Sequence, residues 1–197
     1  MATTTLYLVR HGEAAHPAVR EDPDSGLSEF GVEQARRLGQ RLADVPLDSI
    51  RHSPLRRAEQ TAQIVATHLP RLPVTASELL RDRTPVPTGV DAAAVPMLYR
   101  PFLERVPATE RDVDAVRLRA AFTELATAGD RDRHELLVTH AFVLGWFVRQ
   151  VLDAPAWRWM GLNPSCCGLT IIRVGADLPP MLVRYDDVGH LPAVRTR

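Results

Sequence analysis

The chain alternates short apolar runs with longer amphipathic segments, and this alternation limits the folds open to it. Strands are expected at Leu6–Val9, Leu47–His52 and Glu135–Thr139, each followed along the chain by a helical pattern. The expected helices span about 29–43, 53–69, 111–128 and 142–152, and a terminal strand pair spans 168–174 and 181–185. Such an order predicts an α/β fold, a three-layer sandwich with helices on both faces of an open sheet.

Two helix starts are marked by capping residues. Ser28 precedes the helix that begins near Glu29, and Ser53 precedes Pro54, with serine as the cap and proline at the first helical position. Residues 70 to 107 carry prolines at 85, 87, 96, 101 and 107, which interrupt any long element. We expect an irregular, lid-like insert at about 81–111, partly helical over 92–104.

Composition narrows the class of protein. The 197 residues are 45% apolar, which favours one globular domain spanning 1–197. Lys+Arg and Asp+Glu are equal at 24 each, so neither nucleic acid nor an anionic membrane is expected as a partner. Adjacent Cys166 and Cys167 predict no disulfide. The amino terminus does not resemble a signal peptide, and 136–152 is too short and polar to span a bilayer, so we expect a cytoplasmic protein.

Basic residues gather where the predicted strands end. Arg10 and His11 follow the first strand, and His140 follows the strand at Glu135–Thr139. In open α/β sheets, ligands bind beyond the carboxyl ends of the strands. Arg56 and Arg57 lie in the first turn of a helix, where a cation opposes the helix dipole unless an anion is near. Guanidinium groups and helix amino termini both bind phosphate oxygens, so this rim predicts a phosphoryl site.

These residues have two other interpretations, as ordinary surface or structural residues and as metal ligands. Each arginine taken alone is typical of solvated surface, and a single histidine at a strand end is more often structural. His11, His16 and His140 are candidate metal ligands, but no HExxH or Asp-rich set accompanies them. We therefore expect no metal and no cofactor.

Four segments carry a resemblance to a known family. LYLVRHGE, LSEFGVEQARRL, SPLRRAEQTA and LLVTHA occur in the order typical of the histidine phosphatase superfamily, the phosphoglycerate-mutase-like proteins. The resemblance implies an open, mostly parallel sheet with one antiparallel strand. It also implies that His11 is the transiently phosphorylated nucleophile, that Arg10 and Arg57 clamp the phosphoryl group, and that His140 is the second pocket histidine.

Two carboxylates are candidates for the general acid. The family's acidic residue aligns with Asp82 in SELLRDRTPVP, and Glu78 is the alternative. We also expect Gly12, Glu13 and Ala141 to line the substrate pocket, since glycine lets a backbone approach a ligand closely. His11 is expected to be neutral because nearby arginines lower its pKa, and a backbone contact at its other nitrogen is expected to fix its tautomer.

The resemblance implies a metal-independent phosphomonoester hydrolase that works through phosphohistidine. LLRDRTPVP and the ending YDDVGHLP are moderately similar to the phosphoglycerate-mutase-type Ser/Thr protein phosphatases. The alternatives are a cofactor-dependent phosphoglycerate-type mutase and a catalytically silent phosphoanion-binding module. A phosphorylated small molecule or a phosphoprotein is the expected substrate, and a homo-oligomer is possible. Four arginines of the insert are candidates for binding further negative charge on the substrate: Arg81, Arg83, Arg100 and Arg105.

Overall fold

A six-stranded sheet forms the centre of the computed structural model, which describes residues 2–15, 25–176 and 178–191. Its strands are β1 (Thr3–Arg10), β2 (Ser49–His52), β3 (Val74–Ala76), β6 (Arg133–Thr139), β7 (Leu169–Gly175) and β8 (Leu178–Asp187), in the order β3-β2-β6-β1-β7-β8. Neighbours from β3 to β1 are parallel, and β7 is antiparallel to both β1 and β8. One strand therefore opposes the other five, which confirms the predicted mostly parallel sheet.

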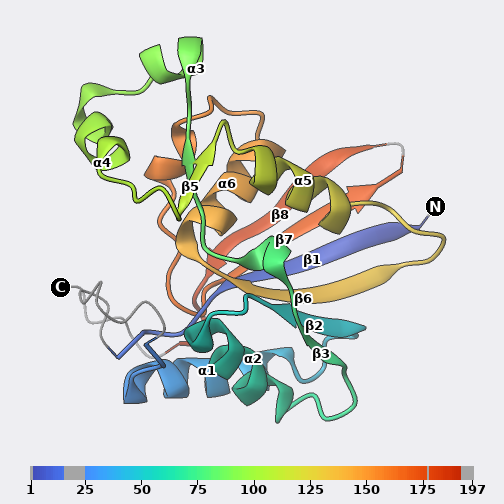
Figure 1. The fold of residues 1–197 in the computed structure, drawn as a ribbon. Helices are drawn as coiled ribbons and strands as arrows, with labels where there is room; N and C mark the ends of the chain where they lie inside the picture. Colours follow the sequence, from blue (N-terminus) through green and yellow to red (C-terminus); the bar gives the residue numbers. More distant parts are fainter. Residues whose placement is uncertain (1, 16–24, 177, 192–197) are drawn as a thin grey trace.

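Helices cover both faces of this sheet (Figure 1). On one face, α1 (Glu29–Leu42) and α2 (Arg56–Ala66) pack on a core that includes Ile50 and Val138. On the other face, α5 (Val116–Leu125) and α6 (Ala141–Val151) bury a second core with Leu8. The predicted three-layer sandwich is confirmed, and the alternating strand residues supply one core each.

The first helix begins where its capping residue predicts. The Ser28 hydroxyl accepts a hydrogen bond from the Gly31 amide at 3.0 Å, and Glu29 is the first helical residue. A Cβ on Gly12 would lie 2.6 Å from the Gly31 carbonyl oxygen. The glycine at 12 therefore lets α1 pack directly on the loop that follows β1.

The predicted start of the second helix is wrong by two residues. α2 begins at Arg56, and Leu55, its N-cap position, is extended with φ −73° and ψ 136°. No side-chain cap is present. Ser53 does not cap this helix. Its hydroxyl accepts from the nearby Leu55 amide at 3.3 Å and also contacts His140. Arg56 and Arg57 do lie in the first turn, as expected.

The insert is built from short pieces. After the 3-10 turn η1 (Glu78–Leu80), which precedes the insert, they are β4 (Thr84–Val86), α3 (Gly89–Ala93), the 3-10 turn η2 (Met97–Tyr99), α4 (Arg100–Glu104) and β5 (Arg111–Val113). β4 and β5 form a separate parallel pair. Residues 92–104 are partly helical, as expected, with a break between the end of α3 at Ala93 and the start of η2 at Met97. Figure 1 shows α3 and α4 on the far side of β5 from the main sheet.

The helix expected from Arg111 begins five residues later. Residues 111–113 pair with β4 instead, and Asp114 and Ala115 then adopt φ of 52°. The buried Asp112 carboxylate accepts from the amides of Arg117 and Leu118 at 3.1 and 2.9 Å, and thereby satisfies the amino end of α5.

The remaining elements follow the sequence closely. The terminal strand pair is present as β7 and β8, and a further 3-10 turn, η3, spans Arg158–Gly161. Cys166 and Cys167 are both free thiols, as expected. The sequence of residues 17–27 predicts a loop, and most of this range lies outside the described residues. Within the described ranges, no helix is long and apolar enough to cross a membrane.

Candidate active site

Three adjacent parallel strands end at one place on the sheet. The carboxyl ends of β1, β6 and β2 lead directly into His11, His140 and Ser53. The His11 amide donates to the Thr139 carbonyl, and the Ser53 amide donates to the Val138 carbonyl, both at 2.9 Å. The sheet register therefore sets the relative positions of these three side chains.

The His11 ring has one nitrogen committed to the backbone. Nδ1 donates to the Gly12 carbonyl oxygen at 2.7 Å, and Arg57 Nε donates to Nε2 at 3.0 Å. Both contacts fit a neutral ring whose Nε2 carries the lone pair. Burial is the largest influence and, with His140 and then the arginines, holds the pKa of His11 well below its ordinary value of 6.5. The predicted tautomer contact is present, but burial outweighs the arginines in lowering this pKa.

His140 lies beside His11 and is almost completely buried. The two ring centroids are 5.2 Å apart, and the planes meet at 61°. Nε2 of His140 lies 2.8 Å from the Ser53 hydroxyl, while Nδ1 lies 3.2 Å from Arg57 Nη2. Burial, followed by Arg57 and Arg10, holds the pKa of His140 well below 6.5, so this ring is also neutral.

Arg10 brings an incompletely paired guanidinium to the same place. Its Nη1 donates to the Pro164 carbonyl at 3.0 Å, whereas its buried Nε has no hydrogen-bond partner in the described part of the chain. A buried N–H without an acceptor costs free energy unless a ligand supplies one. With Arg57, it provides the donors that a phosphoryl group requires.

Asp82 lies within the cluster, and Glu78 does not. Arg57 Nη2 donates to Asp82 Oδ2 at 3.1 Å, and His140 Nδ1 lies 3.5 Å from the same oxygen. Burial raises the pKa of Asp82, although Arg57 opposes the change and about 35% of the side chain is exposed. This direction favours the protonated carboxyl that a general acid needs.

Glu78 instead forms an ion pair with Arg81, at the start of the insert. Arg81 donates to its two carboxylate oxygens at 2.6 and 2.9 Å, and these hydrogen bonds lower the pKa of Glu78. The Thr139 hydroxyl donates to the Leu80 carbonyl at 2.8 Å, which fixes the turn between Glu78 and Asp82 to the end of β6. The geometry therefore brings the shorter carboxylate to the histidines.

The sequence analysis did not identify Thr61 as a site residue. Its buried hydroxyl accepts from the Gly12 amide at 3.0 Å and donates to the Arg57 carbonyl at 2.7 Å. It thus connects the His11 loop to the first turn of α2. The available signal was a hydroxyl four residues after Arg57, inside the apolar stripe of a predicted helix.

The three residues expected to line the substrate pocket lie at different distances from the cluster. Gly12 faces α1, and its amide is used by Thr61, so its missing Cβ accommodates Gly31 rather than a ligand. Glu13 is exposed, and its carboxylate accepts from the Ser28 hydroxyl at 2.9 Å. Ala141 is partly exposed and directly follows His140 as the first residue of α6.

Of the three candidate metal ligands, His11 and His140 lie side by side. His16 lies outside the described residues. Among residues 2–15, 25–176 and 178–191, no group of three or more His, Cys, Asp or Glu side chains has an arrangement that holds a metal ion. The histidines at 11 and 140 contact arginines instead.

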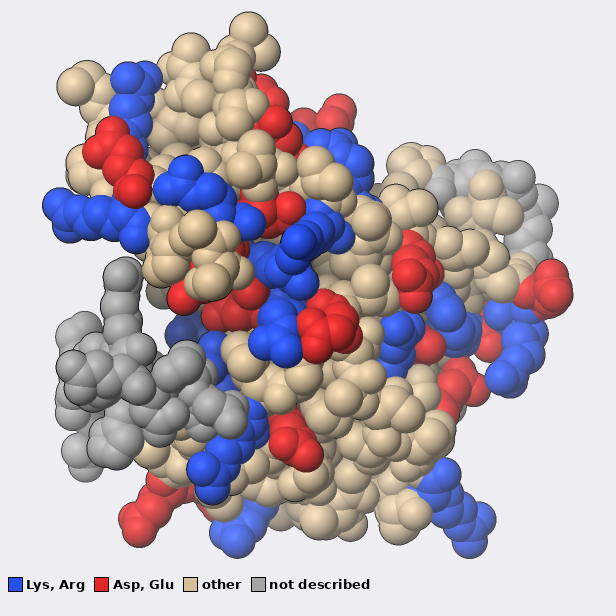
Figure 2. All heavy atoms as spheres, viewed as in Figure 1, with Lys and Arg blue, Asp and Glu red and all other residues tan. Residues whose placement is uncertain are grey.

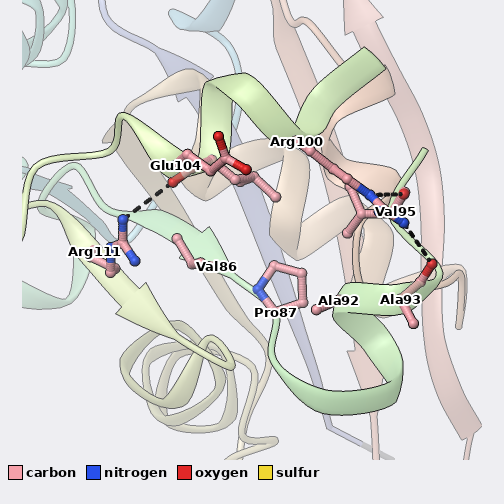
Figure 3. Close-up of a pocket in the computed structure, with 9 residues that line it drawn as sticks. Val86, Pro87, Ala92, Ala93, Val95, Arg100, Glu104 and Arg111 are labelled. Carbon is pink, nitrogen blue, oxygen red and sulfur yellow. Dashed lines mark hydrogen bonds between the residues drawn. The ribbon is translucent and has the colours of Figure 1, made fainter. Parts of the chain in front are cut away.

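A hollow of about 410 Å³ lies within the insert and shares no residue with the histidine cluster (Figure 3). Val86, Val95 and Leu103 form much of its apolar lining. Arg100, a candidate for binding extra negative charge, donates to the Val95 and Ala93 carbonyls at 3.1 and 3.2 Å. Figure 2 shows acidic and basic side chains interleaved over this view of the surface, with neither sign forming a continuous patch.

Comparison with known proteins agrees with this site. Residues 6–187 match the histidine phosphatase superfamily (branch 1), a range that contains the whole cluster. The chain belongs to the histidine phosphatase superfamily. The mitochondrial serine/threonine-protein phosphatase Pgam5 of Caenorhabditis briggsae is 30% identical over 197 residues, a match that covers 96% of this chain and 65% of that protein. The human protein of the same name is 27% identical, with coverage of 97% and 65%.

Solved structures show the same fold. YhfR of Bacillus stearothermophilus superposes with a TM-score of 0.74 at 26% identity, covering 96% of this chain and all of that one. A phosphoserine phosphatase of Entamoeba histolytica gives 0.71 at 21% identity, again over 96% and 100%. This superfamily member spans just under two thirds of the length of the curated relatives above.

Proposed function

We propose that this chain hydrolyses phosphomonoesters through a phosphohistidine on His11. The observation that carries the proposal is the commitment of His11 Nδ1 to the Gly12 carbonyl, which leaves the Nε2 lone pair directed into the cluster. A neutral imidazole with one defined lone pair is the form that attacks phosphorus. The substrate's phosphoryl group takes the place of Arg57 Nε as the partner of Nε2.

In the first step, a bond forms between Nε2 and phosphorus while the bond from phosphorus to the leaving oxygen breaks. Arg10, Arg57 and His140 donate to the non-bridging oxygens, whose charge is stabilised by fixed donors in a buried site. Asp82 delivers its proton to the leaving oxygen, which departs as an alcohol. The products are the alcohol and phosphorylated His11.

In the second step, the Asp82 carboxylate takes a proton from water as the water oxygen bonds to phosphorus. The bond between Nε2 and phosphorus breaks, inorganic phosphate leaves, and both His11 and Asp82 return to their starting states. Both steps draw their charge stabilisation from arginine and histidine, so we propose that the reaction requires no metal. The expected substrate remains a phosphorylated small molecule or a phosphoprotein, in keeping with the relatives' names.

The test is hydrolysis of p-nitrophenyl phosphate in EDTA, with detection of the intermediate. Quenching the wild type in alkaline detergent during turnover of a ³²P-labelled substrate is expected to trap a base-stable label that acid treatment then releases. His11→Ala is expected to abolish both the label and turnover. Turnover without a label in quenched samples, or a label that survives in His11→Ala, contradicts the proposal. Strict dependence on an added metal contradicts the metal-independent part alone.

Substrate class is resolved by a panel measured side by side: phosphoserine, phosphoserine peptides and 3-phosphoglycerate. Release of inorganic phosphate is expected from at least one of the first two. Conversion of 3- to 2-phosphoglycerate faster than hydrolysis identifies a mutase instead. Phosphate binding without turnover of any member, from acid to neutral pH, identifies a silent binding module.

A further inference from the structure

Ser53 is a fully buried hydroxyl at the end of β2, and the proposed mechanism above gives it no role. We propose that Ser53 is a positioning residue that keeps the single proton of His140 on Nδ1, the nitrogen that faces the phosphoryl pocket. The inference rests on the proposed function, because it concerns how His140 serves the phosphoryl group. Ser53 itself touches neither substrate nor His11.

The hydrogen bonds around Ser53 decide the direction of the contact. The Leu55 amide donates to the Ser53 hydroxyl oxygen at 3.3 Å, and His140 Nε2 lies 2.8 Å from that oxygen. A serine hydroxyl has one proton and two lone pairs. No other acceptor for its proton is present among the residues that the structure describes, so the buried hydroxyl is satisfied by donating to Nε2.

This direction places the imidazole proton on Nδ1. A neutral imidazole has one N–H, and when Nε2 accepts a hydrogen bond the proton is on the other nitrogen. Nδ1 lies 3.5 Å from Asp82 Oδ2 and 3.2 Å from Arg57 Nη2. Arg57 Nη2 carries two N–H groups, of which one donates to Asp82 Oδ2 at 3.1 Å and the other is directed at Nδ1. In the proposed mechanism the phosphoryl oxygens accept from Arg57, which leaves the Ser53 hydroxyl to set the tautomer of His140.

The tautomer determines what His140 contributes to catalysis. Burial keeps this ring uncharged, so its only means of stabilising a phosphoryl oxygen is a hydrogen bond from its single N–H. With the proton on Nδ1, that hydrogen bond reaches the pocket. With the proton on Nε2, a nitrogen lone pair faces the oxygens, and the contact becomes repulsive.

The decisive measurement is the ¹⁵N spectrum of protein labelled in the histidine rings, recorded with saturating inorganic phosphate. His140→Gln assigns the signals. In the wild type, Nδ1 of residue 140 is expected at the shift of a protonated nitrogen and Nε2 at that of an unprotonated one. In Ser53→Ala, the two are expected to exchange or to average. A wild-type spectrum with the proton on Nε2, or unchanged signals in Ser53→Ala, overturns the proposal.

Kinetics supplies the second readout. Ser53→Ala is expected to lower kcat for p-nitrophenyl phosphate by about tenfold to a hundredfold, with a smaller change in KM, since the lost donor acts on charge that develops in the transition state. Ser53→Thr keeps the hydroxyl and is expected to restore both the tautomer and most of kcat. Ser53→Cys, similar in size with a weaker donor, replaces alanine if that variant does not fold.

Ser49→Ala is the matched control. Ser49 lies on the same strand, but its hydroxyl contacts Glu135 at 3.5 Å rather than a site residue. It is expected to leave the residue-140 shifts and kcat unchanged. The spectra require no turnover, so a wild type that forms no phosphohistidine yet shows Nδ1–H refutes the proposed function and leaves this assignment standing.

Discussion

The carboxyl end of the sheet and the insert are held together in different ways. At the sheet end, contacts join residues far apart in sequence, such as Thr139 to Leu80 and Gly12 to Thr61. In the insert, Arg100 bonds to carbonyls five and seven residues before it, and apolar side chains such as Leu98 are 82% exposed. Strand register therefore fixes the chemistry, while the insert can vary without moving the histidines.

The largest expected difference is between two arginine variants, one in each region. Arg57→Ala is expected to lower kcat/KM for p-nitrophenyl phosphate by about 10³-fold, or about 4 kcal/mol, because a donor to the transition state is lost. Arg100→Ala is expected to change it less than about threefold, since that guanidinium only ties together the insert. Equal losses in the two variants contradict the division between regions.

Stability separates the regions in the same way. Leu80 is fully buried in the core that contains Leu8, so Leu80→Ala is expected to cost about 3 kcal/mol in the free energy of unfolding. Leu98→Ala removes an exposed side chain and is expected to cost less than about 0.5 kcal/mol. Urea titration measures both. A cost at Leu98 as large as that at Leu80 indicates that something covers the insert in solution.

The acid assignment compares two carboxylates on either side of Leu80. Asp82→Asn is expected to slow hydrolysis of an alkyl phosphate by about 10²-fold, because a poor leaving group needs a proton. The same variant is expected to lose much less with p-nitrophenyl phosphate. Glu78→Gln, which removes only an exposed ion pair, serves as the control and is expected to stay within about twofold of the wild type. The reverse ranking transfers the acid role to Glu78.

A further expected effect is on stability as a function of pH. His11 and His140 have folded-state pKa values well below 6.5, so below that pH the unfolded chain binds protons that the folded chain does not. The free energy of unfolding is therefore expected to fall as the pH drops from 7 to 5, by at most about 2 kcal/mol per histidine. His11→Asn/His140→Asn is expected to flatten this slope in urea titrations. A slope that is steeper in the double variant contradicts burial as the cause.

Activity is expected to depend on pH in the opposite direction, because it falls as the pH rises. Burial raises the pKa of Asp82, so the proton that the first step requires is lost only above that group's ordinary range. We expect kcat/KM for an alkyl phosphate to fall on the alkaline side of an acidic optimum, and Asp82→Asn to remove that limb. Persistence of the limb in the variant assigns it to another group.

Much of the site was predictable because strand ends are visible in sequence. Apolar runs that stop at Arg10 and at His140 mark neighbouring positions once a parallel sheet is predicted, and the helix after Ser28 began as its cap indicated. The sequence could not show which of Asp82 and Glu78 reaches the histidines, because both lie in the same short turn. Which carboxylate reaches the histidines depends on where Thr139 holds the Leu80 carbonyl.

The errors arose where tertiary contacts override local signals. Ser53-Pro54 has the composition of a helix start, yet the Ser53 hydroxyl contacts His140 instead. Leu55 is still extended, and the helix begins only at Arg56. β4 contains Pro85 and is only three residues long, so neither it nor its partner β5 carried a readable pattern. Pairing between such short segments is decided by packing across the insert.

The attachment of His11 Nδ1 to its own neighbour's carbonyl has a stereochemical consequence. Only one ring nitrogen is open, so in the proposed mechanism the phosphoryl group arrives at and departs from the same atom. Each of the two displacements inverts the configuration at phosphorus, so the second displacement restores the original configuration. A phosphate made chiral with oxygen isotopes thus reaches an acceptor alcohol, used in place of water, with its original handedness.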